Sequence, residues 1–514
     1  MAQQRYQTPM FMADKRQNLL YPIFVLWGLI VVFLFTFYLL EEGVAESLQK
    51  YYLLPWTFLT GAVILIPSAY LFFKKKFDPF HPLVFPVWSY FFPAFFIGGL
   101  ILSFDLSQPY YLVFIQDERY ELPLTLVYVM LGFGGLALGF ALPIGKKVGS
   151  FIAGRLPAWQ WTPEQVLKPG VVLLGLGLAN TLLAFSLGIL GFQKTEEINS
   201  YDGIIFLLSL FWLEASFLLW LCIFRTRGKF NLNHYLVIGI LLVTSLTKSA
   251  FQGNRGSLIQ LFILIAFAFS FSGRKIELRH KIVSGLLLTV ALVVGMIYGT
   301  TFRTIKTTEE RMGIDEYAGI VVKTFEKVSE QDFGTILENG LTAMAERFES
   351  VSSLGVVVSN YEKLGSYEAG YGLDNNIWKD SITFLIPRIL WNDKPVATDP
   401  GNYGELYFNF RENSFTITPM GDLLRNFGPV GVPVGMFILG LIIRAVFAAL
   451  QENQEFSFWR ATVFYMLLTS ISYEGSYGLI VPYMVKVGII SVLGILLVRF
   501  MIGRRRLPGL RPGF

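Results

Sequence analysis

The chain has 514 residues, of which 54% are hydrophobic, 16% are aromatic and only 15% are charged. Soluble domains carry about 25% charged residues, so this composition excludes an ordinary soluble protein and indicates a polytopic membrane protein. The net charge of +5 is small and does not call for a nucleic-acid partner. The single cysteine, Cys222, lies in an apolar run and cannot form a disulfide within one chain.

Apolar runs of about 20 residues, long enough to cross a bilayer, recur along the chain. They lie near residues 20–40, 53–73, 82–102, 122–143, 170–191, 204–224, 233–250, 257–272, 282–302, 429–450, 460–480 and 481–500. The pattern predicts an all-α fold with about twelve membrane-spanning helices. Short turns separate the seventh run from the eighth and the eleventh from the twelfth, so these boundaries are the least certain.

The runs divide the chain into three regions. Residues 1–302 hold helices one to nine, 303–428 form one long polar segment, and 429–514 hold the last three helices and a basic tail. Lys and Arg clusters alternate with acidic loops, which predicts cytoplasmic termini and an extracytoplasmic 303–428 segment. Apolar residues at helical spacing over 317–360 predict two amphipathic helices on the bilayer surface.

The histidines limit the chemistry that the outer face can perform. All three, His81, His234 and His280, lie beside predicted cytoplasmic helix ends. A histidine base or a histidine-bound metal is therefore disfavoured on the outer face, where a general base would be a carboxylate or a tyrosine. The sequence has no paired acidic metal motif, P-loop or dinucleotide fingerprint, so we expect neither a metal nor a cofactor.

Arg255 stands in a Gly253-Asn-Arg-Gly256 turn between two apolar runs. A guanidinium beside a helix N-terminus and two glycines suits a phosphate or diphosphate oxygen. An arginine at this depth is costly unless it is paired or solvated, so we predict a functional role. The alternative is an interfacial arginine bonded to a loop carboxylate.

The long polar segment contains cationic residues among aromatic and apolar neighbours rather than in charge runs. Such cations suit a diphosphate, and rings beside them suit a sugar face, whereas salt bridges inside the segment are the alternative. These predicted diphosphate- and glycan-binding residues are Arg347, Arg388, Lys394, Arg411, Trp391 and Tyr403.

Two acidic residues fall inside predicted membrane helices, namely Glu214 and Glu474. A charge at such a position must be paired or neutralised, with Lys248 and Lys486 as candidate counter-ions. Glu474, near the outer end of its helix, could be a general base that faces a cavity. It could equally be a packing residue bonded to Arg255 or Lys486.

The long polar segment and the residues after it contain three distinctive motifs. They are Arg-Phe-Glu-Ser at 347–350, Ile-Pro-Arg-Ile-Leu-Trp-Asn-Asp-Lys-Pro at 386–395, and Thr-Pro-Met-Gly-Asp-Leu-Leu-Arg-Asn-Phe-Gly-Pro-Val-Gly at 418–431. Together these motifs resemble the Wzy-type oligosaccharide repeat-unit polymerases, the O-antigen and exopolysaccharide polymerases. The Gly-x-Arg-Gly turn adds to these motifs, and the resemblance covers roughly 250–450. Some family members carry paired Arg-x10-Gly motifs; here Gly313 and Gly421 stand one residue too early after Arg303 and Arg411, so that motif is not carried over.

The resemblance implies a GT-C-like membrane glycosyltransferase that uses no nucleotide sugar and no metal. Its substrate would be an undecaprenyl-diphosphate-linked oligosaccharide, transferred as a block in the bacterial inner membrane. The family's arginines are thought to hold the diphosphates, a role that Arg255 and Arg388 would take here. From the residues themselves, we predict Arg255 and Glu474 as the catalytic residues. Membrane lipids, a polysaccharide chain-length regulator and a flippase are the implied partners.

Three other functions stay open. An O-antigen ligase shares the donor chemistry but typically adds a loop histidine, which this chain lacks. A lipid-linked oligosaccharide flippase or another transporter also has about twelve helices, but here no repeat relates the two halves. A non-catalytic assembly factor would tolerate loss of Arg255 and Arg388.

Overall fold

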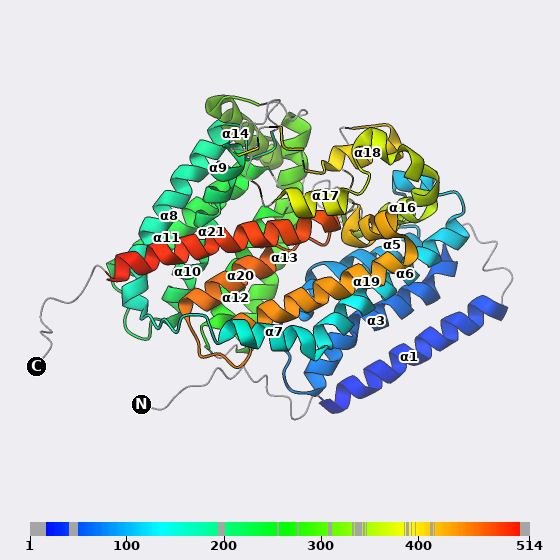
Figure 1. The fold of residues 1–514 in the computed structure, drawn as a ribbon, viewed down its shortest axis with the longest axis horizontal. Helices are drawn as coiled ribbons and strands as arrows, with labels where there is room; N and C mark the ends of the chain where they lie inside the picture. Colours follow the sequence, from blue (N-terminus) through cyan, green and yellow to red (C-terminus); the bar gives the residue numbers. More distant parts are fainter. Residues whose placement is uncertain are drawn as a thin grey trace, which may run out of the picture. The chain divides into compact units, whose positions relative to one another are not determined.

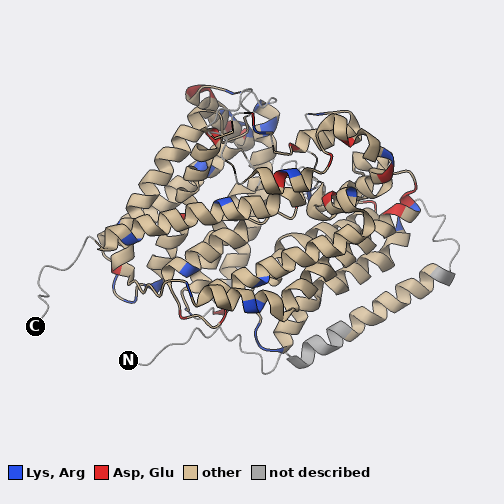
Figure 2. Ribbon diagram, viewed as in Figure 1, with Lys and Arg blue, Asp and Glu red and all other residues tan. Residues whose placement is uncertain are grey.

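The computed structural model is helical in every regular element that it describes. It describes residues 17–40, 50–193, 201–253, 256–274, 277–306, 311–330, 334, 342, 345, 347–384, 386, 390–391, 393–395, 397–411, 415 and 417–503. Figure 2 shows that charged residues are sparse along the long helices. This all-helical, apolar architecture is that of a multi-pass membrane protein.

Within the described residues, nine helical segments are long and apolar enough to span a membrane. They are Tyr51–Phe73, Val84–Ser103, Glu118–Ala141, Pro163–Ser186, Asp202–Arg225, Leu232–Gln252, Ile282–Lys306, Thr418–Leu450 and Tyr477–Gly503. The other three predicted runs correspond to α1 (Gln17–Leu40), α12 (Ser257–Phe271) and α20 (Phe458–Thr469). The last two have only 15 and 12 residues, short of the usual bilayer thickness.

One predicted helix boundary differs from the structure, and another is matched. The start predicted at 429 coincides with a kink in α19 (Thr418–Leu450), where Gly428 has a non-helical φ of +68° and ψ of −168°. A helical segment that begins at Thr418 precedes this kink and was not predicted. The break expected between 480 and 481 instead falls at 470–476, between α20 and α21 (Tyr477–Gly503). Serines and a glycine in this stretch are poor helix formers, and the flanking apolar residues conceal the break from a hydropathy profile. Glu474 therefore lies in a non-helical connection.

The expected pair of surface helices over 317–360 is also different. The structure has α14 (Ile314–Glu330) and α16 (Val351–Leu364) in this region. Residues 351–359 of α16 are all buried. The prediction that this helix lies on the bilayer surface is therefore wrong, because its small and β-branched residues pack on every side.

The chain divides into two compact units. Unit 1 comprises Met1–Leu156, Thr342–Gln454 and Ser470–Met484, and unit 2 comprises Pro157–Leu341, Glu455–Thr469 and Val485–Phe514. Besides α1, α16 and α19, unit 1 contains α3 (Leu54–Phe73), η2 (Val87–Ile97), α5 (Gly98–Ser103), α6 (Glu118–Ala141), α7 (Pro143–Ala153), η4 (Gly365–Tyr371), α17 (Asn376–Thr383) and α18 (Pro400–Phe408). The short elements η1 (Tyr51–Leu53), α4 (Val84–Pro86) and η3 (Tyr110–Phe114) complete it.

The centre of unit 1 is the packing of α19 against α6 and α7 (Figure 1). Glycines allow the backbones to meet: a Cβ built on Gly139 would lie 2.1 Å from the Phe437 carbonyl oxygen. A Cβ on Gly135 would lie 2.4 Å from the Pro433 oxygen. Small residues four apart permit this close approach in membrane helices. These two glycines of α6 thus hold the part of α19 that follows its kink at Gly428.

We expect Gly139→Ala to lower the free energy of unfolding by about 1–3 kcal/mol, because the new methyl group would force the two helices apart. Gly134→Ala is the matched control in the same helix, since a Cβ there meets nothing within 4 Å. Unfolding of both variants by SDS in mixed micelles measures the difference. Equal midpoints for the two variants would contradict the packing argument.

Unit 2 contains α8 (Pro163–Ser186), α9 (Asp202–Ser209), α10 (Phe211–Arg225), α11 (Leu232–Gln252), α12, α13 (Leu278–Lys306), α14, α20 and most of α21. Glu214 is fully buried and accepts a hydrogen bond from the Ser491 hydroxyl at 3.2 Å. Lys248, expected as a counter-ion for an intramembrane acid, instead has its Nζ 3.9 Å above the Trp212 ring. Glu214 therefore has a hydroxyl partner, and its predicted lysine partner makes a cation–π contact.

Candidate functional site

An exposed ion pair joins two of the predicted site residues. Arg347 donates through Nη2 to the Glu474 carboxylate, and the two residues are 127 positions apart in the chain. Their side chains are 50% and 41% exposed. The sequence indicated each of them separately, Arg347 as a diphosphate-binding cation and Glu474 as a base. The structure places them in direct contact in unit 1.

The backbone around Arg347 is anchored against η2 and α5. The Ser350 amide donates to the Ala94 carbonyl at 3.3 Å, and a Cβ on Gly98 would lie 2.8 Å from the Phe348 oxygen. Glu349 turns inward and accepts hydrogen bonds from the amide and hydroxyl of Ser352, in the first turn of α16. Arg347 thus projects from a rigid corner rather than from a free loop.

Two contacts fix the backbone at Glu474, one made by its own carbonyl and one by the preceding residue. Its carbonyl accepts a hydrogen bond from the Thr418 amide at 3.3 Å. The neighbouring Tyr473 is buried, with its ring centroid 6.2 Å from that of Tyr90 and 5.1 Å from that of Phe91. The aromatic cluster and the start of α19 therefore fix the backbone that carries the exposed Glu474 carboxylate.

Burial raises the pKa of Glu349 to about 7, although the hydrogen bonds from Ser352 favour its ionised form. The folded-state pKa exceeds the unfolded-state value of about 4.5, so the folded protein binds more protons between these values. Its stabilising contribution is complete below about pH 4.5 and is lost as the pH rises through about 7.

We therefore expect wild-type stability to fall by at most about 1.4 kcal/mol per pH unit in this window through Glu349. Glu349→Gln keeps an acceptor for Ser352 and cannot ionise, so its stability should vary less with pH. SDS unfolding at pH 5, 6, 7 and 8 compares the two proteins. The same pH dependence in both would show that Glu349 is not the titrating group.

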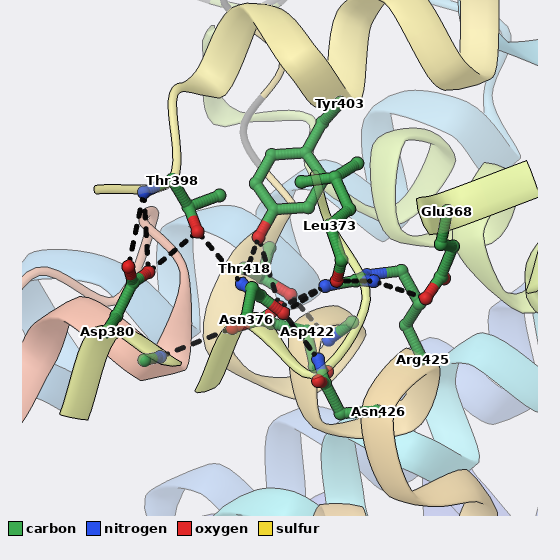
Figure 3. Close-up of polar contacts among 12 residues, drawn as sticks. Glu368, Leu373, Asn376, Asp380, Thr398, Tyr403, Thr418, Asp422, Arg425 and Asn426 are labelled. Atoms are coloured by element: carbon green, nitrogen blue, oxygen red, sulfur yellow. Dashed lines mark hydrogen bonds and ion pairs between the residues drawn. The ribbon is translucent and has the colours of Figure 1, made fainter. Parts of the chain in front are cut away.

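A buried polar network lies at the first turns of α19 (Figure 3). Its centre is Arg425, whose side chain is wholly buried together with that of Asp422. Arg425 bonds to Asp422 at 3.0 Å, to Glu368 at 2.6 Å and to the Leu373 carbonyl at 2.8 Å, and it also donates to the Asn376 side chain. One guanidinium thus connects α19, η4 and the start of α17.

Asp422 is the main acceptor of the network. Its Oδ1 accepts from the Tyr403 hydroxyl at 3.1 Å, from Asn376 at 3.3 Å and from Asn426 at 3.2 Å. Its Oδ2 accepts from the Gly478 amide at 3.2 Å, in the first turn of α21. Because several donors satisfy it, this carboxylate can stay buried. It also joins α19 to the start of α21, which follows the connection that carries Glu474.

A second buried carboxyl group, that of Asp380, extends the network to Thr398. Asp380 accepts hydrogen bonds from the hydroxyl of Thr398 at 2.6 Å and from its amide at 3.3 Å. The Thr398 hydroxyl in turn accepts from Asn376 at 3.3 Å. Burial raises the pKa of Asp380, and it also raises that of Glu368, although Arg425 acts in the opposite direction there.

The backbone is strained where the network meets the ion pair. Thr418 has a φ of +62°, in the left-handed region that a β-branched residue rarely adopts. Such a conformation costs about 1–3 kcal/mol and persists where its surroundings enforce it. The Thr418 hydroxyl accepts from the Gly421 amide at 3.2 Å, and its own amide contacts Glu474. The strain therefore lies at the residue that links α19 to Glu474.

The other predicted residues have different positions. Tyr403 is 2% exposed inside the network, so we assign it to the scaffold rather than to a glycan-contacting surface. Arg411 is exposed and lies 3.9 Å from Glu405, while Lys394 donates to the Ile386 carbonyl at 2.9 Å. Trp391 is 37% exposed. The predictions for Arg255 and Arg388 fall outside the described residues.

Four residues of the network, Asp422, Arg425, Asn376 and Asp380, were given no role from the sequence. Asp422 and Arg425 could have been recognised from the sequence. An acid and a base three residues apart, just before an apolar run, must be paired or functional. Asn376 and Asp380 gave no such signal. Their role depends on contacts with residues 22 and 46 positions away for Asn376 and 18 positions away for Asp380.

The site's chemistry is that of a fixed acid and a fixed guanidinium. Among the residues that the structure describes, no group of three or more His, Cys, Asp or Glu is placed to hold a metal ion.

Comparison of the chain with protein-family models, with curated proteins and with solved structures finds no match.

Proposed function

We propose that the chain is a membrane glycosyltransferase that joins undecaprenyl-diphosphate-linked oligosaccharide repeat units by block transfer, as a Wzy-type polymerase. The observation that carries the proposal is the exposed pair of Arg347 and Glu474 on its buried polar support. A guanidinium suits a diphosphate, and an exposed carboxylate suits deprotonation of a sugar hydroxyl. The motif resemblance over roughly 250–450 supports the same function.

In the proposed reaction, an acceptor hydroxyl attacks the anomeric carbon at the reducing end of the donor glycan. The new glycosidic bond forms as the bond from that carbon to the diphosphate oxygen breaks. Undecaprenyl diphosphate leaves with the bonding electrons, and Glu474 takes the hydroxyl proton. Arg347 stabilises the charge on the leaving diphosphate. The motif resemblance implies the same diphosphate-binding role for Arg255 and Arg388.

The protein acts in the bacterial inner membrane, with both termini cytoplasmic and the 303–428 segment outside. Its reaction follows export of the lipid-linked repeat unit by a flippase, and a chain-length regulator is the proposed protein partner. The GT-C-like fold belongs to this proposal.

Deletion and complementation test the function, with surface and lipid-linked glycans resolved by size. We expect Arg347→Ala, Arg255→Ala and Arg388→Ala each to abolish long chains while single lipid-linked repeat units accumulate outside. Polymerisation in isolated membranes should survive EDTA. Loss of all lipid-linked material from the outer face would indicate export instead. Full-length but unattached polymer would indicate a ligase, and unchanged polymer in all three variants an assembly factor.

A further inference from the structure

Helix α17 buries polar side chains and exposes apolar ones, which is the reverse of a helix on a water-exposed surface. Its buried residues are Asn376, Ile377 and Asp380. Asn376 and Asp380, one turn apart, both belong to the polar network. Its exposed face carries Trp378 at 58% exposure and Ile382 at 64% exposure, also one turn apart. A helix that buries its amide and carboxylate and exposes an indole and an isoleucine is suited to an apolar solvent.

A helix of the same unit shows the ordinary arrangement. The first nine residues of α16 are buried, and its exposed positions are Glu362 and Lys363. The inverted polarity of α17 is therefore not shared by this neighbouring helix. Exposed apolar side chains continue beyond the C-terminal end of α17, where Ile386 is 41% exposed and Leu390 is 79% exposed.

The exposed face of α17 continues onto a membrane-spanning helix. The ring centroids of Trp378 and Phe427 lie 6.2 Å apart, edge to face. Phe427 lies just before the kink of α19 at Gly428. Beyond the kink, exposed apolar residues follow the helix at a spacing of four, with Val430 at 71%, Val434 at 50% and Ile438 at 46%. These residues belong to a candidate span, in which an exposed apolar stripe faces lipid.

We propose that α17 is an interfacial membrane helix whose Trp378 and Ile382 enter the leaflet on the side of the 342–428 segment. Tryptophan favours the membrane–water interface, where its apolar ring and its N–H are both accommodated. Burial of the apolar face in lipid contributes favourable transfer free energy. Because Asn376 and Asp380 on the opposite face bind the network, lipid contact at α17 and the position of Arg425 are mechanically linked.

Site-directed spin labelling tests the proposal in the full-length protein in liposomes. Cys222 is the only cysteine and is buried, so Cys222→Ser provides the background. Nitroxides are placed singly at Trp378→Cys and Ile382→Cys. Tyr367→Cys, an exposed aromatic position at 62% in η4, is the aqueous control, and Val434→Cys is the lipid reference.

We expect labels at 378 and 382 to collide with oxygen much more than with a water-soluble nickel chelate. The oxygen-to-nickel collision ratio should be several-fold above that at 367 and closer to that at 434. A ratio equal to that at 367 would overturn the proposal by placing α17 in water. Shielding from both reagents would also overturn it, in favour of a protein surface covering this face. Quenching of native fluorescence by brominated lipid, reduced in Trp378→Phe, provides a second readout without a label.

Discussion

Arg425→Ala should destabilise the protein by about 3–5 kcal/mol, because breaking a buried ion pair leaves an uncompensated charge in the interior. The side chains of Arg425 and Asp422 are wholly buried, and Glu368 is 10% exposed. Without the guanidinium, Glu368 loses its ion-pair partner. Asp422 keeps its neutral donors, Tyr403 and the Gly478 amide among them. Unfolding in SDS mixed micelles measures the loss.

Arg411→Ala is the matched control for this measurement. The Arg411 side chain is 63% exposed and its guanidinium lies 3.9 Å from Glu405, so its removal should change stability by no more than about 1 kcal/mol. Arg425→Lys should fall between the two, because an ammonium cannot reproduce the fork that reaches Glu368, Asp422 and the Leu373 carbonyl together. If Arg425→Ala unfolds at the same SDS fraction as Arg411→Ala, the network does not stabilise the fold.

The membrane character of the chain could be predicted from sequence because hydropathy is a local property. Nine of the predicted runs match helices long and apolar enough to span, within the part of the chain that the structure describes. The helical segment before the Gly428 kink of α19 was less predictable. It begins at Thr418 through a hydroxyl cap and is held by two hydrogen bonds to distant segments. Likewise, the break before α21 at 470–476 is short and lies between apolar stretches, so a hydropathy window of about 20 residues spans it.

The site could be predicted only in part, for a different physical reason. Arg347 and Glu474 were recognised by residue type and setting, but their contact joins positions 127 residues apart and has no local signature. Tyr403 was expected at a glycan surface, whereas its hydroxyl bonds to Asp422 in the interior. An aromatic residue among polar neighbours looks the same in sequence in either case, because the distinction depends on tertiary burial.

Glu474→Gln should slow polymerisation by about 10²–10⁴-fold, since an amide cannot take the acceptor hydroxyl's proton. That factor corresponds to about 3–5 kcal/mol in the transition state. Folding should be nearly unaffected, because the exposed ion pair with Arg347 contributes about 0–1 kcal/mol. The measurement is the rate at which membranes containing equal amounts of each variant convert single lipid-linked repeat units into longer glycans.

The second exposed ion pair of the same unit supplies the control. Glu405 pairs with Arg411 at 3.9 Å, and its side chain is 38% exposed, close to the 41% of Glu474. Glu405→Gln removes the same charge from a similar setting, so a general electrostatic effect would slow both variants alike. Only a proton-accepting role makes Glu474→Gln slow while Glu405→Gln stays near the wild-type rate and Glu474→Asp recovers part of the loss. Equal rates in the two Gln variants would remove Glu474 from the reaction and leave Arg347 as a binding residue without a base beside it.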